Sequence, residues 1–512
     1  MKEISPISEK LVDEEVFRPN FHFTPENNWM NDPNGMFFLN GTYHLYFQYY
    51  PEGNVWGPMH WGHATSQDMI TWEEQGIALE PDEMGYIFSG SAVVDHNNTS
   101  GFGEGTTPPV IAMFTYHDPK GEKEGRIDYQ SQAIAYSLDE GKTWTKYEGN
   151  PVIANPDIKD FRDPKVTWDE QHKQWIMALA TVDRTLFYSS PNLKDWNLLS
   201  EFGEGTGAHE GVWECPDFFP MKVKNSDEEK WVLIQSLNPG GYNGGSGTQY
   251  FIGDFDGKKF TVDPSMQDLP EKHNHWIDYG KDNYAGVTWS NIPASDGRHL
   301  FLGWMSNWLY AQEVPTEKWR SAMTIARELE LHKDGTGFRI FSQPVEELDK
   351  YVSQTIKKDP VDIPASGTII LAEDIDLSKA RIRFSFKPSE KSRQEFYLGN
   401  KEGDSLIFGY NPTEKQFFIN REDSGLTNFN PDFGKNVSTA PRTSEDEIIS
   451  VNIILDKTSI EIFYDEGETV MTEIFFPNSP YETLSAKGET NFSISEIQLQ
   501  QFNFSGTDDH QK

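Results

Sequence analysis

A weak internal repeat constrains the fold of this chain more than any other feature of its sequence. The stretch SQDMITW at 66–72 returns as SLDEGKTW at 137–144, again at 189–196, and more loosely at 253–260. Each copy predicts a strand, a polar turn and an aromatic residue that opens the next strand. Repeats of roughly 50 to 70 residues that each form a small antiparallel sheet are typical of a β-propeller.

A second repeat runs in step with the first and places an acidic residue just before a proline. Asp32-Pro33, Asp163-Pro164 and Glu214-Cys215-Pro216 each lead into a strand–turn–strand unit, whereas the units at 90–116 and 284–304 lack the acid. The five units predict five blades that start near residues 32, 90, 163, 214 and 284. Because the innermost strand of each blade lines the central channel, the three acids are expected to converge on one pocket.

The repeats stop after about residue 345, and the pattern changes. Residues 346–365 are predicted to form a linker with a short helix or strand. Plain apolar alternation follows at 381–386, 405–410 and 451–455, with a hairpin signal at 456–464. The sequence therefore predicts an all-β protein, with a five-bladed β-propeller over 16–345 and a β-sandwich over 366–507.

Composition narrows the classes of partner. Among 512 residues, 41 Gly and 30 Pro fit a loop-rich β protein, and the net charge of −37 argues against nucleic acid and anionic membranes. No apolar run of about 18 residues is present, so membrane insertion is not expected. The single cysteine, Cys215, rules out an internal disulfide and a multi-cysteine zinc site.

The location of the protein stays open at this stage. The segment from Met1 to Arg18 is polar and acidic and lacks the apolar core of a signal peptide. Two locations fit: the cytoplasm, or an extracellular or periplasmic home if a signal peptide has been removed. No sequence feature indicates an oligomeric state.

A glycosidase usually has two catalytic carboxylates, one on each side of the bond that it cleaves. Glu214 lies between Trp213 and Cys215, an apolar setting that would keep a general acid protonated. Asp32 lies between Asn31 and Asn34, whose amides could donate hydrogen bonds to an ionised nucleophile. Taken singly, each acid is more often a turn or surface residue, but three such acids have no reason to share one phase of a repeat.

The third acid, Asp163, follows Arg162 directly in the sequence. The adjacent positive charge is expected to hold Asp163 ionised. An anionic Asp163 could bind sugar hydroxyls and stabilise a cationic transition state.

The segments 29–35, 161–164 and 213–216 resemble motifs of a known family, glycoside hydrolase family 32, and the resemblance extends from about Phe17 to Phe504. That family includes invertases, inulinases and levanases. Supporting matches occur at 47–51, 56–63, 88–91, 246–251 and 303–308. The resemblance rests chiefly on three motifs: Trp29-Met30-Asn31-Asp32-Pro33-Asn34-Gly35, Phe161-Arg162-Asp163-Pro164 and Trp213-Glu214-Cys215-Pro216.

The resemblance implies Asp32 as nucleophile, Glu214 as acid/base and Asp163 as transition-state stabiliser. Trp29 and Trp56 would form an apolar wall. The residues implied for fructose binding are Trp29, Asn31, Gln48, Trp56, Phe88, Ser89, Arg162, Tyr284 and Trp304. No cofactor or metal is implied; His60 and His63 share one motif, but their spacing suits hydrogen bonding better than one ion.

The expected function is release of fructose from a β-fructan (levan or inulin) or sucrose by a retaining, exo-acting mechanism. Loops at 240–249 and 304–320 resemble those of exo-acting levanases and inulinases. Four alternatives stay open: a fructosyltransferase, an endo-fructanase, an inverting five-bladed arabinan or xylan glycosidase, and a non-catalytic sugar-binding propeller.

Overall fold

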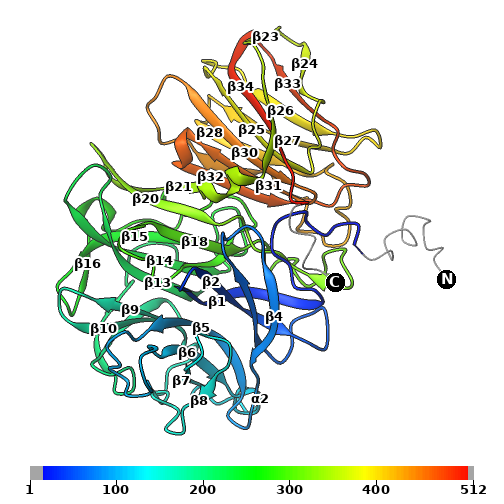
Figure 1. Cartoon of the computed structure of the whole chain (residues 1–512). Coiled ribbons are helices and arrows are strands. Elements are labelled where there is room, and N and C mark those ends of the chain that lie inside the picture. The colour runs from blue at the N-terminus through cyan, green and yellow to red at the C-terminus, as the bar shows by residue number, and fades with distance from the viewer. Residues whose placement is uncertain (1–14, 506–512) are drawn as a thin grey trace.

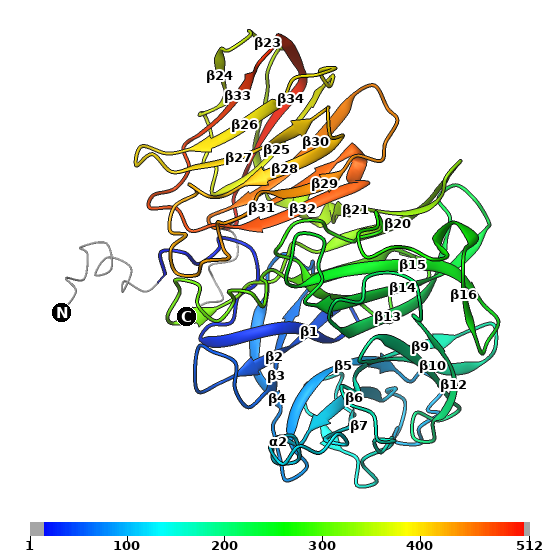
Figure 2. The ribbon, with the colours of Figure 1, turned by 180° about the vertical axis from the view of Figure 1, so that it is seen from behind.

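The computed structural model describes residues 15–505 and shows a ring of sheets beneath a stack of two sheets (Figures 1 and 2). Residues 1–14 of the N-terminal segment from which the location is inferred, and residues 506–507 of the expected sandwich, lie outside this range. Within it, no helix is long and apolar enough to cross a membrane. The short helices are α2 (Pro119–Lys123), η1 (Pro264–Met266), η2 (Glu346–Tyr351) and η3 (Asp465–Gly467).

Residues 28–344 form five antiparallel sheets, each with its innermost strand first in sequence. The first sheet holds β1 (Asn28–Leu39), β2 (Thr42–Tyr50), β3 (His60–Ser66) and β4 (Glu73–Leu79), with β19 (Trp319–Arg320) added beside β1. The second holds β5 (Tyr86–Val94), β6 (Val110–His117), β7 (Gln130–Ser137) and β8 (Thr145–Lys146). The third holds β9 (Arg162–Asp169), β10 (Gln174–Thr181), β11 (Arg184–Ser190) and β12 (Asn197–Phe202).

The fourth sheet holds β13 (Val212–Lys222), β14 (Glu229–Asn238), β15 (Gly247–Phe255) and β16 (Phe260–Val262). The fifth holds β17 (Tyr284–Thr288), β18 (His299–Trp304), β20 (Arg327–Asp334) and β21 (Gly337–Pro344). The five first strands contact one another in cyclic order, and β17 closes back on β1. Parallel pairing of β19 with β1 also ties the last sheet's loop to the first sheet.

Two further sheets face each other in the C-terminal part. One has the order β22-β34-β25-β30-β31-β32, with β23 also on β34; the other has the order β24-β33-β26-β27-β28-β29. The bounds in the first are β22 (Val352–Lys357), β23 (Val361–Ile363), β25 (Lys379–Phe386), β30 (Ile449–Asp456), β31 (Ser459–Tyr464), β32 (Thr469–Ile474) and β34 (Phe492–Phe502). The bounds in the second are β24 (Thr368–Ala372), β26 (Gln394–Gly399), β27 (Ser405–Asn411), β28 (Gln416–Asn420), β29 (Ser438–Pro441) and β33 (Thr483–Gly488).

The all-β class and the propeller-like domain followed by a sandwich are therefore confirmed. We interpret the five sheets of the ring as the five expected blades. The domain boundaries remain a prediction. The segment expected to be a linker begins with η2 and then supplies β22 and β23, which both pair with β34 of the sandwich.

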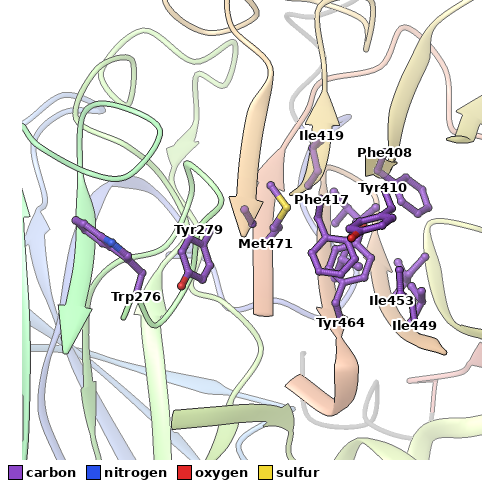
Figure 3. Close-up of a cluster of buried hydrophobic side chains, with 14 of the residues drawn as sticks. Trp276, Tyr279, Phe408, Tyr410, Phe417, Ile419, Ile449, Ile453, Tyr464 and Met471 are labelled. Atoms are coloured by element: carbon purple, nitrogen blue, oxygen red, sulfur yellow. The ribbon is translucent and has the colours of Figure 1, made fainter. Parts of the chain in front are cut away.

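One apolar core continues from the ring into the sandwich. Trp276 and Tyr279, from the loop after β16, lie beside Met471 of β32, and sandwich side chains continue the cluster beyond it (Figure 3). The Tyr279 N–H donates to the Val470 carbonyl at 2.8 Å. The two domains therefore share buried apolar area, so each stabilises the other.

Charged side chains are also buried where the two domains meet. Arg327 of β20 donates to Asp278 at 2.9 Å and to Glu461 of β31 at 2.6 Å. His22, from the segment before β1, lies between Asp456 at 2.8 Å and the same Glu461 at 2.6 Å. All five side chains are fully buried, so the charges compensate one another inside the protein.

Candidate active site

Every inner strand of the ring has a break in its pairing register at the same level. The breaks fall between Met30 and Pro33, Ile87 and Gly90, Glu214 and Asp217, and Tyr284 and Val287, and in β9 opposite Ala178 to Ala180. A bulge leaves residues unpaired and turns their side chains away from the regular alternation. The proline after each acid fits here, because a bulge tolerates a residue that cannot donate to the ladder.

The three acids come together at these breaks. Asp32, Asp163 and Glu214 all line one cavity of about 240 Å³ at the N-terminal ends of the inner strands. Asp163 adopts a φ of 67° and Cys215 a φ of 45°, which departs from strand geometry and aims both side chains inward. The convergence expected from the repeat is present in the structure.

Asp32 is buried and held by three donors. The Ser89 hydroxyl donates to its Oδ2 at 2.6 Å, the Asn31 amide to its Oδ1 at 3.1 Å, and the Cys215 thiol to its Oδ2 at 3.2 Å. Burial raises the pKa of Asp32, the Ser89 hydrogen bond lowers it, and the charge of Glu214 raises it again. The carboxyl is therefore harder to ionise than an exposed aspartate.

Asp163 is also buried, and its position is set by backbone and side-chain contacts. Its Oδ2 accepts from the Cys215 backbone N–H at 3.0 Å, and its own N–H donates to the Thr115 hydroxyl at 3.0 Å. Burial raises the pKa of Asp163 to about 7, although Arg162 lowers it. Arg162 lowers the pKa of Asp163 as expected, but desolvation and the charges of Glu214 and Asp32 outweigh it, so Asp163 is harder to ionise than an exposed aspartate.

Glu214 has a polar environment instead of the apolar one expected from its neighbours in sequence. Arg162 Nη2 donates to its Oε1 at 3.0 Å, and the Tyr284 hydroxyl donates to its Oε2. Trp213 turns away from the cavity and is fully buried in the core. Sequence neighbours on a strand point to opposite faces, which is why adjacency misled here.

As the single cysteine, Cys215 excluded an internal disulfide and a multi-cysteine zinc site, but the sequence did not indicate that it lies in the active site. Its thiol contacts both Asp32, at 3.2 Å, and Asp163, at 3.5 Å. Burial and the three nearby carboxylates raise the pKa of Cys215 well above its ordinary value. The thiol therefore stays protonated and can donate to the acids.

Six of the residues expected to bind fructose line the cavity: Asn31, Gln48, Trp56, Phe88, Ser89 and Arg162. Asn34 does not donate to Asp32; its side-chain oxygen accepts from Gln48 at 2.8 Å, and its amide bonds the Pro33 carbonyl. The pleat of β1 explains this, because Asn31 and Asn34 flank a bulge.

Trp29, Tyr284 and Trp304 are not among the residues that line this cavity, and their expected contact with fructose remains a prediction. All three are essentially fully buried. Trp29 and Trp304 pack on Trp308, with ring centroids 5.7 and 5.0 Å apart, and Trp308 lines the cavity in their place. They support the wall instead of forming it.

Sequence reasoning missed a second group of lining residues. These are His117, Glu122, Tyr129, Gln130, Asp160 and Trp308. Arg162 Nη1 donates to Asp160 at 2.8 Å, which fixes the guanidinium beside Glu214. Most of the group lies outside the motifs, on β6, α2, β7 and the loop before β9, so only the fold brings it to the site.

The two motif histidines take part in hydrogen bonding. His60 Nδ1 lies 2.9 Å from the Pro58 carbonyl, and His63 Nε2 lies 3.1 Å from His44 Nδ1. Across the described residues, no group of three or more His, Cys, Asp or Glu side chains is arranged to hold a metal ion.

Family models match nearly the whole chain. The model described as "Glycosyl hydrolases family 32 N-terminal domain" covers residues 22–344, and the one described as "Glycosyl hydrolases family 32 C terminal" covers residues 346–501. A ring of β-sheets with three acids in one axial cavity defines a glycosidase-like protein, and the matches make the class definite. The chain belongs to glycoside hydrolase family 32, as the motifs predicted.

Individual relatives agree with this membership. The chain is 47% identical over 467 residues to a levanase of Bacillus subtilis (strain 168), covering 91% of this chain and 67% of the relative. It is 38% identical over 508 residues to an extracellular exo-inulinase of Aspergillus awamori, covering 94% of both.

Solved structures show the same fold. The crystal structure of the Aspergillus awamori exo-inulinase superposes with a TM-score of 0.85 at 35% identity, covering 95% of this chain and 98% of that one. A β-fructofuranosidase from Schwanniomyces occidentalis complexed with fructosyl-erythritol gives the same TM-score and identity, covering 96% and 99%.

Proposed function

We propose that the protein is a retaining β-fructosidase that releases terminal fructose from a fructan or from sucrose. The observation that carries the proposal is the convergence of Asp32, Asp163 and Glu214, from three different inner strands, on one cavity. The relatives named levanase and exo-inulinase support the same substrate class.

In the first step, a carboxylate oxygen of Asp32 attacks the anomeric carbon of the terminal fructosyl unit. The bond from that carbon to the leaving oxygen breaks, and Glu214 gives its proton to the leaving oxygen. The product is a fructosyl ester on Asp32. The Tyr284 hydroxyl can accept as well as donate, so it can hold Glu214 in both protonation states.

In the second step, Glu214 takes a proton from water, and the water oxygen attacks the same carbon. The ester bond to Asp32 breaks and fructose leaves with its original configuration. Two inversions at one carbon give net retention. Each transition state carries positive charge on the sugar ring, which an ionised Asp163 stabilises.

The cavity favours cleavage at a chain end. Its volume of about 240 Å³ lies below the roughly 300–1,000 Å³ of drug-sized pockets, so it suits one sugar unit. Trp56 and Phe88 offer apolar edges to that unit, and Arg162 offers hydrogen-bond donors. The Gln48 amide nitrogen already donates to Asn34 and to the Ile87 carbonyl, so Gln48 offers its amide oxygen as an acceptor. A cavity that holds a single terminal unit favours exo-action on levan or inulin.

Two other outcomes use the same site. If a sugar hydroxyl replaces water in the second step, the enzyme acts as a fructosyltransferase. If internal bonds reach Asp32, it acts as an endo-fructanase. Inverting hydrolysis would require a water molecule between the two carboxyls, which needs a separation of roughly 6.5–9.5 Å.

The test is a product time course by chromatography on levan, inulin and sucrose, with the Asp32→Ala and Glu214→Gln variants run beside the parent protein. From the earliest point we expect fructose as the released sugar from levan and inulin, fructose with an equal amount of glucose from sucrose, and no product from Asp32→Ala. Early mixed oligosaccharides would show endo-cleavage, and longer fructans would show transfer. Intact substrates with the parent protein would overturn the proposal.

A further inference from the structure

A second cavity, of about 550 Å³, lies at the opposite ends of four of the inner strands that form the active site. It takes Val93 from β5, Lys165 from β9, Phe219 from β13 and Thr288 from β17. These residues follow the pairing breaks in their strands, two of which hold the acids Asp163 and Glu214. The cavity therefore opens at the other mouth of the ring and has no part in the chemistry proposed above.

The floor of this cavity is polar and buried. Lys165 is 5% exposed; its ammonium donates to the Thr288 carbonyl and lies 3.3 Å from Asp217 Oδ2. Asp217 Oδ2 also accepts from the Thr288 N–H and hydroxyl, both at 2.7 Å. The other oxygen, Oδ1, is buried and has no hydrogen-bond partner among the described residues. Asp217 itself does not line the cavity; it holds Lys165 and Thr288, which do.

His299 adds a neutral donor and acceptor to the wall. Its ring stacks on Phe219 with centroids 5.1 Å apart, and no hydrogen bond to its ring nitrogens is present within residues 15–505. Burial lowers the pKa of His299 to about 4. At neutral pH the imidazole is therefore uncharged and offers one N–H and one lone pair.

Aromatic rings supply the rest of the wall. Trp168 is partly exposed and meets Trp175 edge to face, with centroids 4.9 Å apart at 65°. The Trp168 N–H donates to Glu170 at 2.7 Å, which fixes the orientation of the ring. Trp289 and Phe219 complete the apolar part. A held aromatic face beside hydrogen-bonding groups is the arrangement that accepts the C–H face of a sugar.

The charges on the wall are already compensated, which argues against a charged ligand. Asp95 accepts from the backbone and hydroxyl groups of Thr99 and Ser100. Arg298 is forked between Asp296 and Glu347. Lys165 is paired with Asp217 as described above. The groups left to bind a ligand are therefore neutral or already paired.

We infer that this second cavity is a non-catalytic binding site for a neutral oligosaccharide of two or three sugar units. Its volume is about twice that of the active-site cavity. Trp168 stacks on a sugar ring, and the His299 imidazole exchanges hydrogen bonds with sugar hydroxyls. The choice of sugar as ligand rests on the proposed function, whereas the site itself rests on the wall just described.

The test is titration calorimetry of the Asp32→Ala protein with sucrose and with 1-kestose, both of which it should leave intact. We expect two sites per chain. The further change Trp168→Ala should leave one site, and so should Trp56→Ala, which acts on the active-site cavity instead. A single site in Asp32→Ala, or two sites that survive Trp168→Ala, would overturn the inference.

A second measurement guards against misfolding. In the otherwise unmodified protein, Trp168→Ala and His299→Leu should leave sucrose hydrolysis within about twofold, because neither residue lines the active-site cavity. If Asp32→Ala still hydrolyses sucrose, the proposed function fails. A lost second site with intact hydrolysis supports the inference on its own.

Discussion

At the scale of single residues, the site depends on a few donors that face buried carboxylates. The three acids could be predicted because the motifs and the repeat identified them. Their partners could not, since Ser89, Cys215 and Tyr284 reach Asp32, Asp163 and Glu214 only through the fold. Burial of each acid is a property of the folded ring, and sequence neighbours gave the wrong environment for Glu214 and an incomplete one for Asp163.

Removal of the Ser89 hydroxyl should move the pH dependence of the reaction. Burial raises the pKa of Asp32, and Ser89 lowers it. We expect the acid limb of kcat/KM in the parent protein to lie above pH 3.8, the ordinary Asp value, and to move further up in Ser89→Ala. The measurement is kcat/KM for sucrose against pH; an unmoved limb would contradict the assigned role.

Replacement of Cys215 should separate donor chemistry from packing. Cys215→Ala removes the only thiol contact to Asp32 and Asp163, and we expect kcat to fall by roughly 10- to 150-fold, the range of about 1.5–3 kcal/mol for one hydrogen bond to a charged group. Cys215→Ser keeps a donor and should retain most of the activity. Equal loss in both variants, with melting temperatures unchanged, would argue against a donor role.

At the scale of elements, the break in pairing at one level of all five inner strands is what builds the site. The acid–proline repeat located three of these breaks, and Phe88-Ser89 and Ala285-Gly286 occupy the equivalent breaks in the two units without an acid. The sequence could not show that Trp308 would pack against Trp29, because that contact joins segments about 280 residues apart.

Gly90 tests whether the break in β5 needs a glycine. A Cβ at Gly90 would lie 1.9 Å from the Met113 carbonyl oxygen. That oxygen belongs to the backbone of β6, which cannot move far enough to make room. We expect Gly90→Ala to cost at least about 1–3 kcal/mol of unfolding free energy and to lower activity by displacing Ser89. Gly335→Ala, where no atom lies within 4 Å of the new Cβ, is the matched control.

Denaturant unfolding followed by tryptophan fluorescence measures both variants. The control should unfold within about 0.5 kcal/mol of the parent protein. If Gly90→Ala is as stable and as active as Gly335→Ala, close approach of β5 to β6 is not what shapes this part of the site.

At the scale of the whole molecule, buried charges and a shared apolar core join the ring to the sandwich. Sequence alternation predicted the sandwich, but not that Arg327, Asp278 and Glu461 would meet beneath it. Such a network depends on the docking of two domains, which no local pattern encodes. It makes the stability of the molecule depend on pH.

His22 is the group in that network whose pKa is raised from a value near neutral pH. Burial alone would lower the pKa of His22, but hydrogen bonds to Asp456 and Glu461 raise it to about 9, from 6.5. The folded protein thus binds the proton more tightly than the unfolded chain. The stabilisation is complete below about pH 6.5 and is lost as pH rises through about 9.

We therefore expect His22→Gln to lower the melting temperature most at pH 6 and progressively less between pH 7 and 10. The free energy at stake is of the order of a few kcal/mol. Melting by differential scanning fluorimetry of both proteins across this range gives the difference curve. A difference that stays constant with pH would contradict the assigned proton.

The most direct test of the retaining mechanism is the configuration of the product when methanol competes with water in the second step. The parent protein is incubated with sucrose and methanol, and the methyl fructofuranoside is identified by nuclear magnetic resonance before it can be hydrolysed. Attack by Asp32 followed by attack of methanol predicts the methyl β-fructofuranoside, and none from Asp32→Ala. Formation of the α-anomer, or of the β-anomer by Asp32→Ala at the parent rate, would contradict the central claim.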